Sequence, residues 1–325
     1  MTKKRIEPAH TEQEWTRRDV LRLLSVGGVA FASGLGGCVA APVATRGPAS
    51  RTASASRAPE RRVEPVRDFF FLQLSDTHWG FRGDANPEAE STLRRAIRTI
   101  NATRSRPDFV VFTGDLTHTT DDPAVRRTRL REFRAIVDEL DVKTRYFLPG
   151  EHDASLDAGE AYKAEFGETH YSFEHGGIRF VALDNVSDPT GSLGDAQLDW
   201  LRKTLDGIPA DAPLVVLAHR PLFDLYPAWD WATRDGARAL TLLEGRTNVT
   251  VFYGHIHQEH HHEAAGIRHH AARSLVFPLP APGSVPKKAP VPWDAGAPFR
   301  GLGYRSVRES GSGEPTLAEL PVETA

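Results

Sequence analysis

The 325-residue chain has one cysteine, Cys38, so it cannot form an intramolecular disulfide. The fold must therefore rest on a hydrophobic core, and hydrophobic residues make up 40% of the chain, enough for one large domain.

Positive charge is also scarce in most of the chain. Of the formal net charge of −3, residues 1–67 carry six excess positive charges, which leaves −9 on residues 68–325. Such an acidic body argues against binding to duplex nucleic acid.

The first 37 residues have the pattern of an export signal. Arg17 and Arg18 precede an uncharged stretch, residues 23–45, which is rich in Gly, Ala and Ser and too weakly hydrophobic for a stable membrane span. The arginine pair resembles a twin-arginine signal peptide, read by the twin-arginine export machinery. Residues 35–38 resemble a bacterial lipobox, whose cysteine is acylated. We therefore expect an exported protein, anchored to a membrane by lipid at Cys38, on the periplasmic or extracytoplasmic face.

Residues 38–67 and 68–325 differ in organisation. The first segment is rich in Ala, Pro, Ser, Thr and Arg without periodicity, which is typical of a flexible tether. The second is expected to form a single domain in which strands alternate with helices, as in an α/β fold. Strands are predicted at 69–74, 109–112, 145–148, 214–217 and 249–252, a hairpin at 169–183, and helices at 87–101, 122–140, 194–205 and 231–243.

Carboxylates and histidines follow five of these predicted strands. Ligands of α/β sheets bind at this edge, and mixed oxygen and imidazole ligands suit Fe, Mn, Zn or Co. Eight such side chains are more than one ion needs and suit two ions that share a carboxylate, an arrangement that hydrolyses phosphate esters. They are Asp76, His78, Asp115, Glu151, His152, His219, His255 and His257.

The order of these groups resembles the calcineurin-like metallophosphoesterase superfamily, which includes class III cyclic-nucleotide phosphodiesterases and purple acid phosphatases. The motifs that carry the resemblance are Asp76-x-His78, Gly114-Asp115, Gly150-x-His152-Asp153, His219 and Gly254-His255-x-His257. It implies two packed mixed β-sheets flanked by helices, a four-layer sandwich. It also implies that one ion binds Asp76, His78 and His257, that the other binds Glu151, His219 and His255, and that Asp115 bridges both. A hydroxide between the ions would attack the phosphorus of a small phosphate ester, with His152 as general acid.

Glu151 departs from this pattern, because the family usually has Asn there. With Glu151, two divalent ions and a bridging hydroxide would give a ligand shell with no net charge, whereas Asn would leave one positive charge. Three interpretations stay open: a trivalent ion such as Fe(III), a weakly charged substrate such as a phosphodiester, or a Glu151 turned away from a weak second site. A non-catalytic lipoprotein that binds a metal or ligand on the same fold is the alternative to an enzyme.

Four features near these motifs have open roles. His118, three residues after Asp115, is expected to support a ligand or to be a plain loop residue. Five histidines within 260–270 are expected to form a hairpin, with His270 the candidate for a contact to a ligand. The aromatic segment 221–231 could line the substrate site or fill core, and Arg220 and Arg234 could bind phosphate or form surface ion pairs. The segment 278–298, with seven prolines, Lys287 and Lys288, is expected to be irregular and could narrow access to the site.

Overall fold

The five apolar runs form parallel strands within two β-sheets. The computed structural model describes residues 65–310 and 314–322. In one sheet, β1 (Phe69–Leu74), β2 (Phe109–Thr113) and β3 (Arg145–Leu148) are parallel. In the other, β6 (Leu214–Leu217) lies parallel to β7 (Val249–Tyr253). All four residues of β6 and all five of β7 are buried, which is why these strands read as unbroken apolar runs.

Further strands complete both sheets, two of them parallel to their central neighbour and the others antiparallel. The five-stranded sheet has the order β11-β10-β1-β2-β3 and the six-stranded sheet the order β4-β5-β6-β7-β9-β8. The added strands are β4 (Tyr171–His175), β5 (Ile178–Ala182), β8 (His260–Ala264), β9 (Ile267–Ala271), β10 (Gly303–Glu309) and β11 (Thr316–Pro321). Strands β8 and β9 form the predicted hairpin at the histidine-rich segment.

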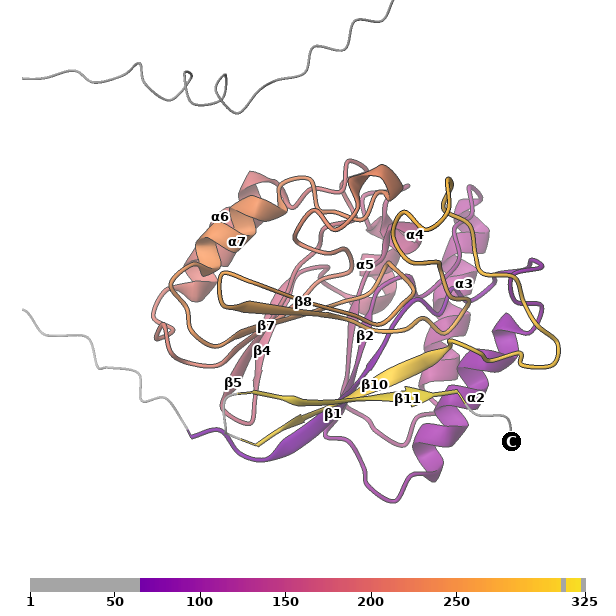
Figure 1. Cartoon of the computed structure of the whole chain (residues 1–325), viewed down its shortest axis with the longest axis horizontal. Coiled ribbons are helices and arrows are strands. Elements are labelled where there is room, and N and C mark those ends of the chain that lie inside the picture. Colours follow the sequence, from indigo (N-terminus) through magenta and orange to yellow (C-terminus); the bar gives the residue numbers. More distant parts are fainter. Residues whose placement is uncertain (1–64, 311–313, 323–325) are drawn as a thin grey trace, which may run out of the picture. The chain divides into compact units, whose positions relative to one another are not determined.

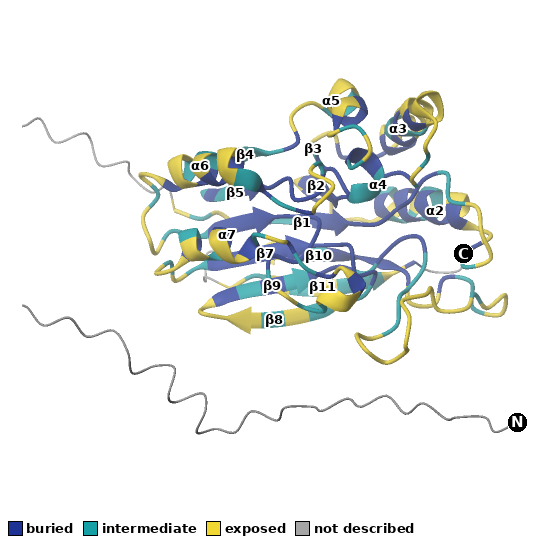
Figure 2. Ribbon diagram, turned by 90° about the horizontal axis from the view of Figure 1, so that it is seen from above, coloured by how far each residue is buried: buried dark blue, intermediate teal, exposed yellow. Residues whose placement is uncertain are grey.

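Helices cover the outer face of each sheet, and the sheets pack on each other (Figures 1 and 2). The helices α2 (Ala89–Ala102), α3 (Pro123–Val137), α4 (Glu151–Ala154) and α5 (Glu160–Phe166) follow strands of the first sheet, and α6 (Gly194–Leu205) and α7 (Gly236–Leu243) accompany the second. Between the sheets lies an aromatic cluster that includes Phe71, Phe109, Phe180 and Phe252. Separate clusters join each sheet to its helices. This confirms the predicted α/β fold with two mixed sheets flanked by helices.

Several predicted boundaries differ from the structure, most of all at the helix that precedes β7. The helix predicted to start at Trp231 starts at Gly236, because Tyr226 and Trp231 pair across a short 3-10 turn, Pro227–Trp229. Helix α3 ends at Val137, three residues before the predicted end. Helices α4 and α5 and strands β10 and β11 were not predicted at all.

The predicted signal at 1–37, the lipid anchor at Cys38 and residues 38–64 of the predicted tether lie outside the described residues. Within the described ones, no helix is both long and apolar enough to cross a membrane. The single domain expected over 68–325 stays a prediction.

Candidate metal centre

The predicted site residues lie in loops that follow β1, β2, β3, β6 and β7. These loops come together where the carboxyl ends of the strands of the two sheets lie next to each other. Their nitrogen and oxygen atoms form overlapping groups, and within each group these atoms lie less than 4.8 Å apart. The structure thus brings all eight together: Asp76, His78, Asp115, Glu151, His152, His219, His255 and His257.

Five of the eight have a backbone conformation that L-amino acids rarely adopt. Asp76, His78, Asp115, His255 and His257 have φ between 43° and 67°, in the left-handed region. This conformation costs roughly 1–2 kcal/mol per residue. Contacts between the loops stabilise it; for example, the His78 N–H donates to the Asp115 carbonyl (2.9 Å). Such strain concentrates at functional sites because it aims side chains that regular structure would direct elsewhere.

The glycines of the motifs allow the loops to approach one another. A Cβ atom on Gly150 would collide with the carboxylate and backbone nitrogen of Asp115. One on Gly254 would collide with the Ser75 hydroxyl and approach the Asp76 carboxylate to 2.7 Å. Any side chain at these positions would therefore displace predicted ligands.

One group of potential ligands is formed by Asp76, His78, Asp115 and His257, all buried. His78 Nε2 lies 3.2 Å from His257 Nε2, and His257 Nε2 lies 3.4 Å from Asp76 Oδ1. A second group is formed by Glu151, His219 and His255. Here Glu151 Oε2 lies 2.9 Å from His219 Nε2, and Glu151 Oε1 lies 2.9 Å from His255 Nδ1. The Glu151 carboxylate thus points into the second group rather than away from it.

Asp115 lies between the two groups. Its Oδ2 atom is 3.4 Å from His78 Nε2 in the first group and 3.4 Å from His219 Nε2 in the second. Its Oδ1 atom accepts a hydrogen bond from the His152 backbone N–H (3.0 Å), which fixes the carboxylate. This is the place that a carboxylate shared by two ions must occupy.

Hydrogen bonds set which nitrogen of each buried histidine is free to bind an ion. Carbonyl oxygens only accept, so a ring nitrogen bonded to one must carry its hydrogen, and in the neutral ring the other nitrogen keeps its lone pair. In three rings the nitrogen that faces away from the site is bonded in this way: His219 Nδ1 to Thr113 (2.7 Å), His255 Nε2 to Asp230 (3.0 Å) and His257 Nδ1 to Phe277 (2.8 Å).

The second group also contains buried polar atoms that lack a hydrogen-bond partner among the described residues. They are Glu151 Oε2, His219 Nε2 and His255 Nδ1. Oε2 lies 2.9 Å from His219 Nε2, and the other oxygen, Oε1, lies 2.9 Å from His255 Nδ1. Buried polar atoms are rarely left unpaired, and one cation among these three would satisfy all of them. The second group therefore fits a metal ion, and the buried carboxylates and imidazoles of the first group are ligand types that suit one as well.

The carboxylates of the site are ionised. Burial alone would raise the pKa of Glu151, but His255 and His219 hold it well below its usual value. Burial likewise opposes the ionisation of Asp115, yet His219, His152 and His78 help to lower its pKa to about 2. His219 is buried, which disfavours its charged form, but Asp115 and Glu151 raise its pKa well above normal. Three carboxylates, Asp76 included, thus give the site a negative charge that metal cations balance.

His152 stands at the open side of the site, with about a quarter (26%) of its side chain exposed. The Thr119 backbone N–H donates to His152 Nδ1 (3.2 Å), so the ring hydrogen sits on Nε2. Nε2 lies 3.9 Å from Asp115 Oδ2 and faces the ligands. His152 is therefore placed to donate a hydrogen bond to a group bound there.

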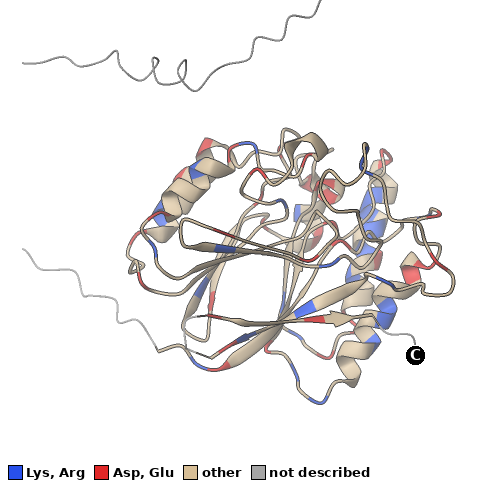
Figure 3. Cartoon of the chain, viewed as in Figure 1, with Lys and Arg blue, Asp and Glu red and all other residues tan. Residues whose placement is uncertain are grey.

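His118 supports the site from behind His78. Its Nδ1 lies 3.3 Å from His78 Nδ1, and its ring stacks on that of His152 (5.1 Å between centroids). The Arg129 guanidinium, on the arginine-rich helix α3 (Figure 3), donates to the His118 carbonyl (2.7 Å) and fixes this loop. His118 thus contacts a potential ligand, as expected for a supporting residue.

Asp153 is part of the motif at 150–153, but the sequence indicates no role for it. In the structure it connects the loops that carry the predicted ligands. Its buried carboxylate accepts hydrogen bonds from the backbone N–H groups of Gly150 (2.9 Å), Leu116 (2.9 Å) and Thr117 (2.8 Å). Leu116 directly follows Asp115, and Gly150 directly precedes Glu151. Its position next to His152 was the only signal in the sequence.

The other candidates lie farther from the ligands. His270 contacts His261 (2.8 Å between Nδ1 atoms) rather than a ligand, which corrects the expectation for it. Trp229 and Trp231 fill a core cluster with Tyr253, so segment 221–231 mostly packs. Arg220 is buried and pairs with Asp230, whereas the Arg234 side chain is exposed.

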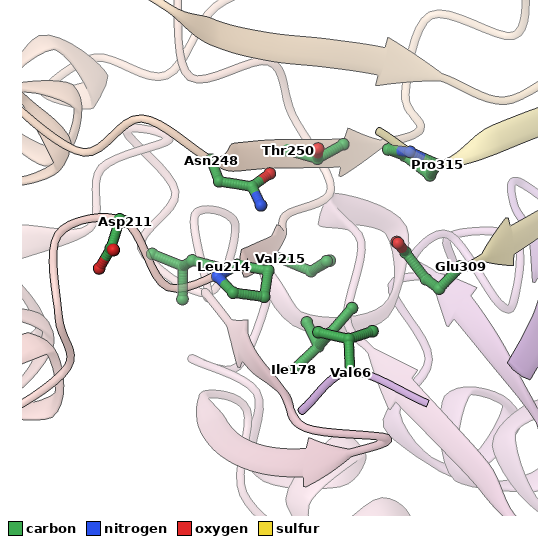
Figure 4. A pocket seen from close by; sticks show the side chains of 10 residues that line it. Val66, Ile178, Asp211, Leu214, Val215, Asn248, Thr250, Glu309 and Pro315 are labelled. Carbon is green, nitrogen blue, oxygen red and sulfur yellow. The ribbon is translucent and has the colours of Figure 1, made fainter. Parts of the chain in front are cut away.

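A separate cavity of about 220 Å³ lies at the opposite end of the sheets (Figure 4). Leu214 and Thr250, at the start of β6 and β7, line it together with Glu309 at the end of β10. Figure 4 shows the Glu309 carboxyl turned toward this cavity. None of the predicted ligands lines it, so it is distinct from the metal centre.

Two groups of potential ligands around a shared carboxylate, at the carboxyl edge of a β-sandwich flanked by helices, are the arrangement expected of a binuclear metallohydrolase. The model of the family described as calcineurin-like phosphoesterase matches residues 71–259. The chain belongs to this family of metal-dependent phosphoester hydrolases, so it is an enzyme of that class. Its dimetal members use two metal ions, and the residues above could hold them.

Curated relatives agree with this assignment. The chain is 32% identical to a probable cyclic nucleotide phosphodiesterase of Rhodococcus erythropolis over 230 residues, 66% of this chain and 73% of the relative. It is also 32% identical to a probable glycerophosphodiester phosphodiesterase, GpdQ, of Arcobacter nitrofigilis over 165 residues, 46% of this chain and 57% of the relative.

Solved structures share the fold. A dimetal phosphatase from Danio rerio is similar over 79% of this chain and 100% of its own, with a TM-score of 0.52 and 17% identity. Purple acid phosphatase PPD1 from yellow lupin is similar over 81% of this chain and 54% of its own, with a TM-score of 0.53 and 15% identity.

Proposed function

We propose that this enzyme hydrolyses small phosphodiesters in preference to phosphomonoesters. The observation that carries the proposal is the Glu151 carboxylate, which lies 2.9 Å from both His219 Nε2 and His255 Nδ1. It adds a third negative charge to the ligand set, where a neutral amide would add none. Lowering the positive charge of the site weakens its attraction for the dianion of a monoester about twice as much as its attraction for the monoanion of a diester. The names of the two curated relatives reported above support the same substrate class.

The chain's own residues would divide the work as follows. Asp76, His78 and His257 would hold one ion, Glu151, His219 and His255 would hold the other, and Asp115 would contact both. When bound, the ions would lower the pKa of a water and offset the charge that develops on the phosphoryl group. His152 would donate a hydrogen bond from Nε2–H to the leaving oxygen as it gains charge. The Thr119 N–H keeps that hydrogen on Nε2.

The test is turnover of bis(p-nitrophenyl) phosphate and p-nitrophenyl phosphate by protein reconstituted separately with Mn, Zn, Co and Fe. We expect kcat/KM to be higher for the diester with divalent ions. Asp115→Asn should abolish turnover, because it weakens a ligand that both ions need. A preference for the monoester, with iron bound, would favour the trivalent-ion interpretation of Glu151. No turnover with both positions filled would instead favour a non-catalytic binding protein.

We also propose that the enzyme is exported by the twin-arginine route and anchored by lipid at Cys38. The support is the arginine pair at 17–18 and the lipobox-like residues 35–38. In a host with both pathways, the full chain should fractionate with membranes, whereas Cys38→Ser should release it. Replacing Arg17 and Arg18 by Lys should retain the protein in the cytoplasm, and export that survives this change would contradict the proposal.

A further inference from the structure

The proline-rich segment 278–298 begins beside the metal centre. It follows Phe277, whose carbonyl accepts the hydrogen bond from His257 Nδ1 (2.8 Å) and whose ring lies 4.8 Å from that of His257. The segment contains no helix or strand. Gln258 Nε2 donates to the Pro280 carbonyl (3.0 Å), so the start of the segment is held against the loop that carries His257.

The segment reaches the other side of the centre through Lys288. Its Nζ donates to the Trp229 carbonyl (3.1 Å). The next residue, Asp230, has φ of 64° and accepts the hydrogen bond from His255 Nε2 (3.0 Å). Lys288 is therefore held one residue away from the contact that orients His255, a ligand in the same group as Glu151.

The charge of Lys288 is not taken up by a neighbouring carboxylate. No Asp or Glu within 65–310 and 314–322 forms an ion pair with it. The nearby Asp230 carboxylate is paired with the buried Arg220. The Lys288 pKa is lowered, chiefly by partial burial, while Glu151 and Asp115 act in the opposite direction. The carboxylates of the metal centre are thus within electrostatic reach of this ammonium group.

We propose that Lys288 is a substrate-binding residue whose ammonium group contacts a non-bridging oxygen of the phosphodiester at the metal centre. It restores, from outside the ligand set, the positive charge that Glu151 removes. A cation there favours any phosphate anion and is not itself a metal ligand, because an ammonium group has no lone pair. The inference rests on the proposed function, because it names the group that binds the diester.

Lys288→Met tests this role, with Lys287→Met as the matched control on the same segment. Lys287 has the same charge and, like Lys288, is exposed, but it has no contact that holds it toward Trp229. A hydrogen bond to a charged group contributes about 1.5–3 kcal/mol, so KM for bis(p-nitrophenyl) phosphate should rise roughly 10- to 100-fold in Lys288→Met. We expect kcat to change less than KM, Lys287→Met to stay within about twofold of the wild type, and Lys288→Arg to recover most of the affinity.

Binding of inorganic phosphate to the Mn-loaded protein, measured by calorimetry, separates this inference from the proposed function. If the wild type hydrolyses no ester but Lys288→Met alone weakens phosphate binding, the function fails and the anion site stands. If the wild type is active and Lys288→Met changes neither KM nor the phosphate Kd, the inference is wrong. Equal losses in both Met variants would also overturn it. Metal content and Tm are measured for every variant, and Lys288→Gln replaces Lys288→Met if the latter loses metal.

Discussion

The buried carboxyl of Glu309 should make the stability of this enzyme fall as the pH rises. Glu309 is 6% exposed and lines the cavity at the end of the sheets remote from the metal centre. Burial raises its pKa from 4.5 to about 7, although Arg268 acts in the opposite direction. The folded protein therefore keeps a proton on Glu309 at pH values where the unfolded chain has lost it.

The sign and size of the effect follow from this difference. Below pH 4.5 the carboxyl is protonated in both states and imposes no penalty. As the pH rises to about 7, unfolding releases a proton and becomes progressively more favourable. At 1.36 kcal/mol per pKa unit, the loss of stability sums to about 3 kcal/mol. Glu309→Gln, which has no proton to lose, should abolish this loss.

The assay is urea unfolding of the wild type and Glu309→Gln from about pH 4.5 to 8.5, with the exposed Glu314→Gln as control. The difference between variant and wild type cancels the titration of other groups. We expect Glu309→Gln to gain stability relative to the wild type as the pH rises, by about 3 kcal/mol in total. A difference that stays constant across this range, or one matched by Glu314→Gln, would refute the reasoning.

Three further predictions concern the metal centre. Glu151→Asn should raise activity on p-nitrophenyl phosphate relative to bis(p-nitrophenyl) phosphate by about tenfold, because it removes a negative charge near the substrate; an unchanged ratio would separate Glu151 from substrate choice. Asp153→Ala should lower the free energy of unfolding by about 3–5 kcal/mol and reduce metal content, since three backbone N–H groups lose their acceptor. A variant whose free energy of unfolding in urea is close to that of the wild type would contradict this. A chelator should lower Tm reversibly, since ions at 100 times their Kd add about 2.7 kcal/mol of stability, and re-added metal should restore it.

The parallel strands and the polar residues that follow them could be predicted from the sequence, because the arrangement of a buried parallel sheet accounts for both. Strands covered on two faces must be apolar throughout, and residues past their carboxyl ends meet at one edge. For this reason the strands β1, β3 and β6 have the predicted bounds. Strand β10, which lies between β11 and β1, was missed because it buries charge: Arg305 is fully buried, where it donates to the Ala271 carbonyl and pairs with Glu319.

The parts of the site that could not be predicted depend on the backbone. Thr113, Asp230 and Phe277 orient three of the predicted ligand histidines through their carbonyl oxygens. Every residue type has a backbone carbonyl, so the sequence could not identify these three. The direction of Glu151 was also open, because its type does not show whether it points inward. Lys288 lies more than 130 residues from Glu151 in the sequence, and only the path of the proline-rich segment brings it near.

Metal content per chain tests the central claim most directly. The described domain is purified with its native metals, and the ions are quantified by mass spectrometry beside an Asp115→Asn variant. Two groups joined by Asp115 predict about two ions per chain in the wild type and at least one fewer in the variant. One ion or none in a folded wild type, or the same content in both proteins, would contradict a binuclear centre bridged by Asp115.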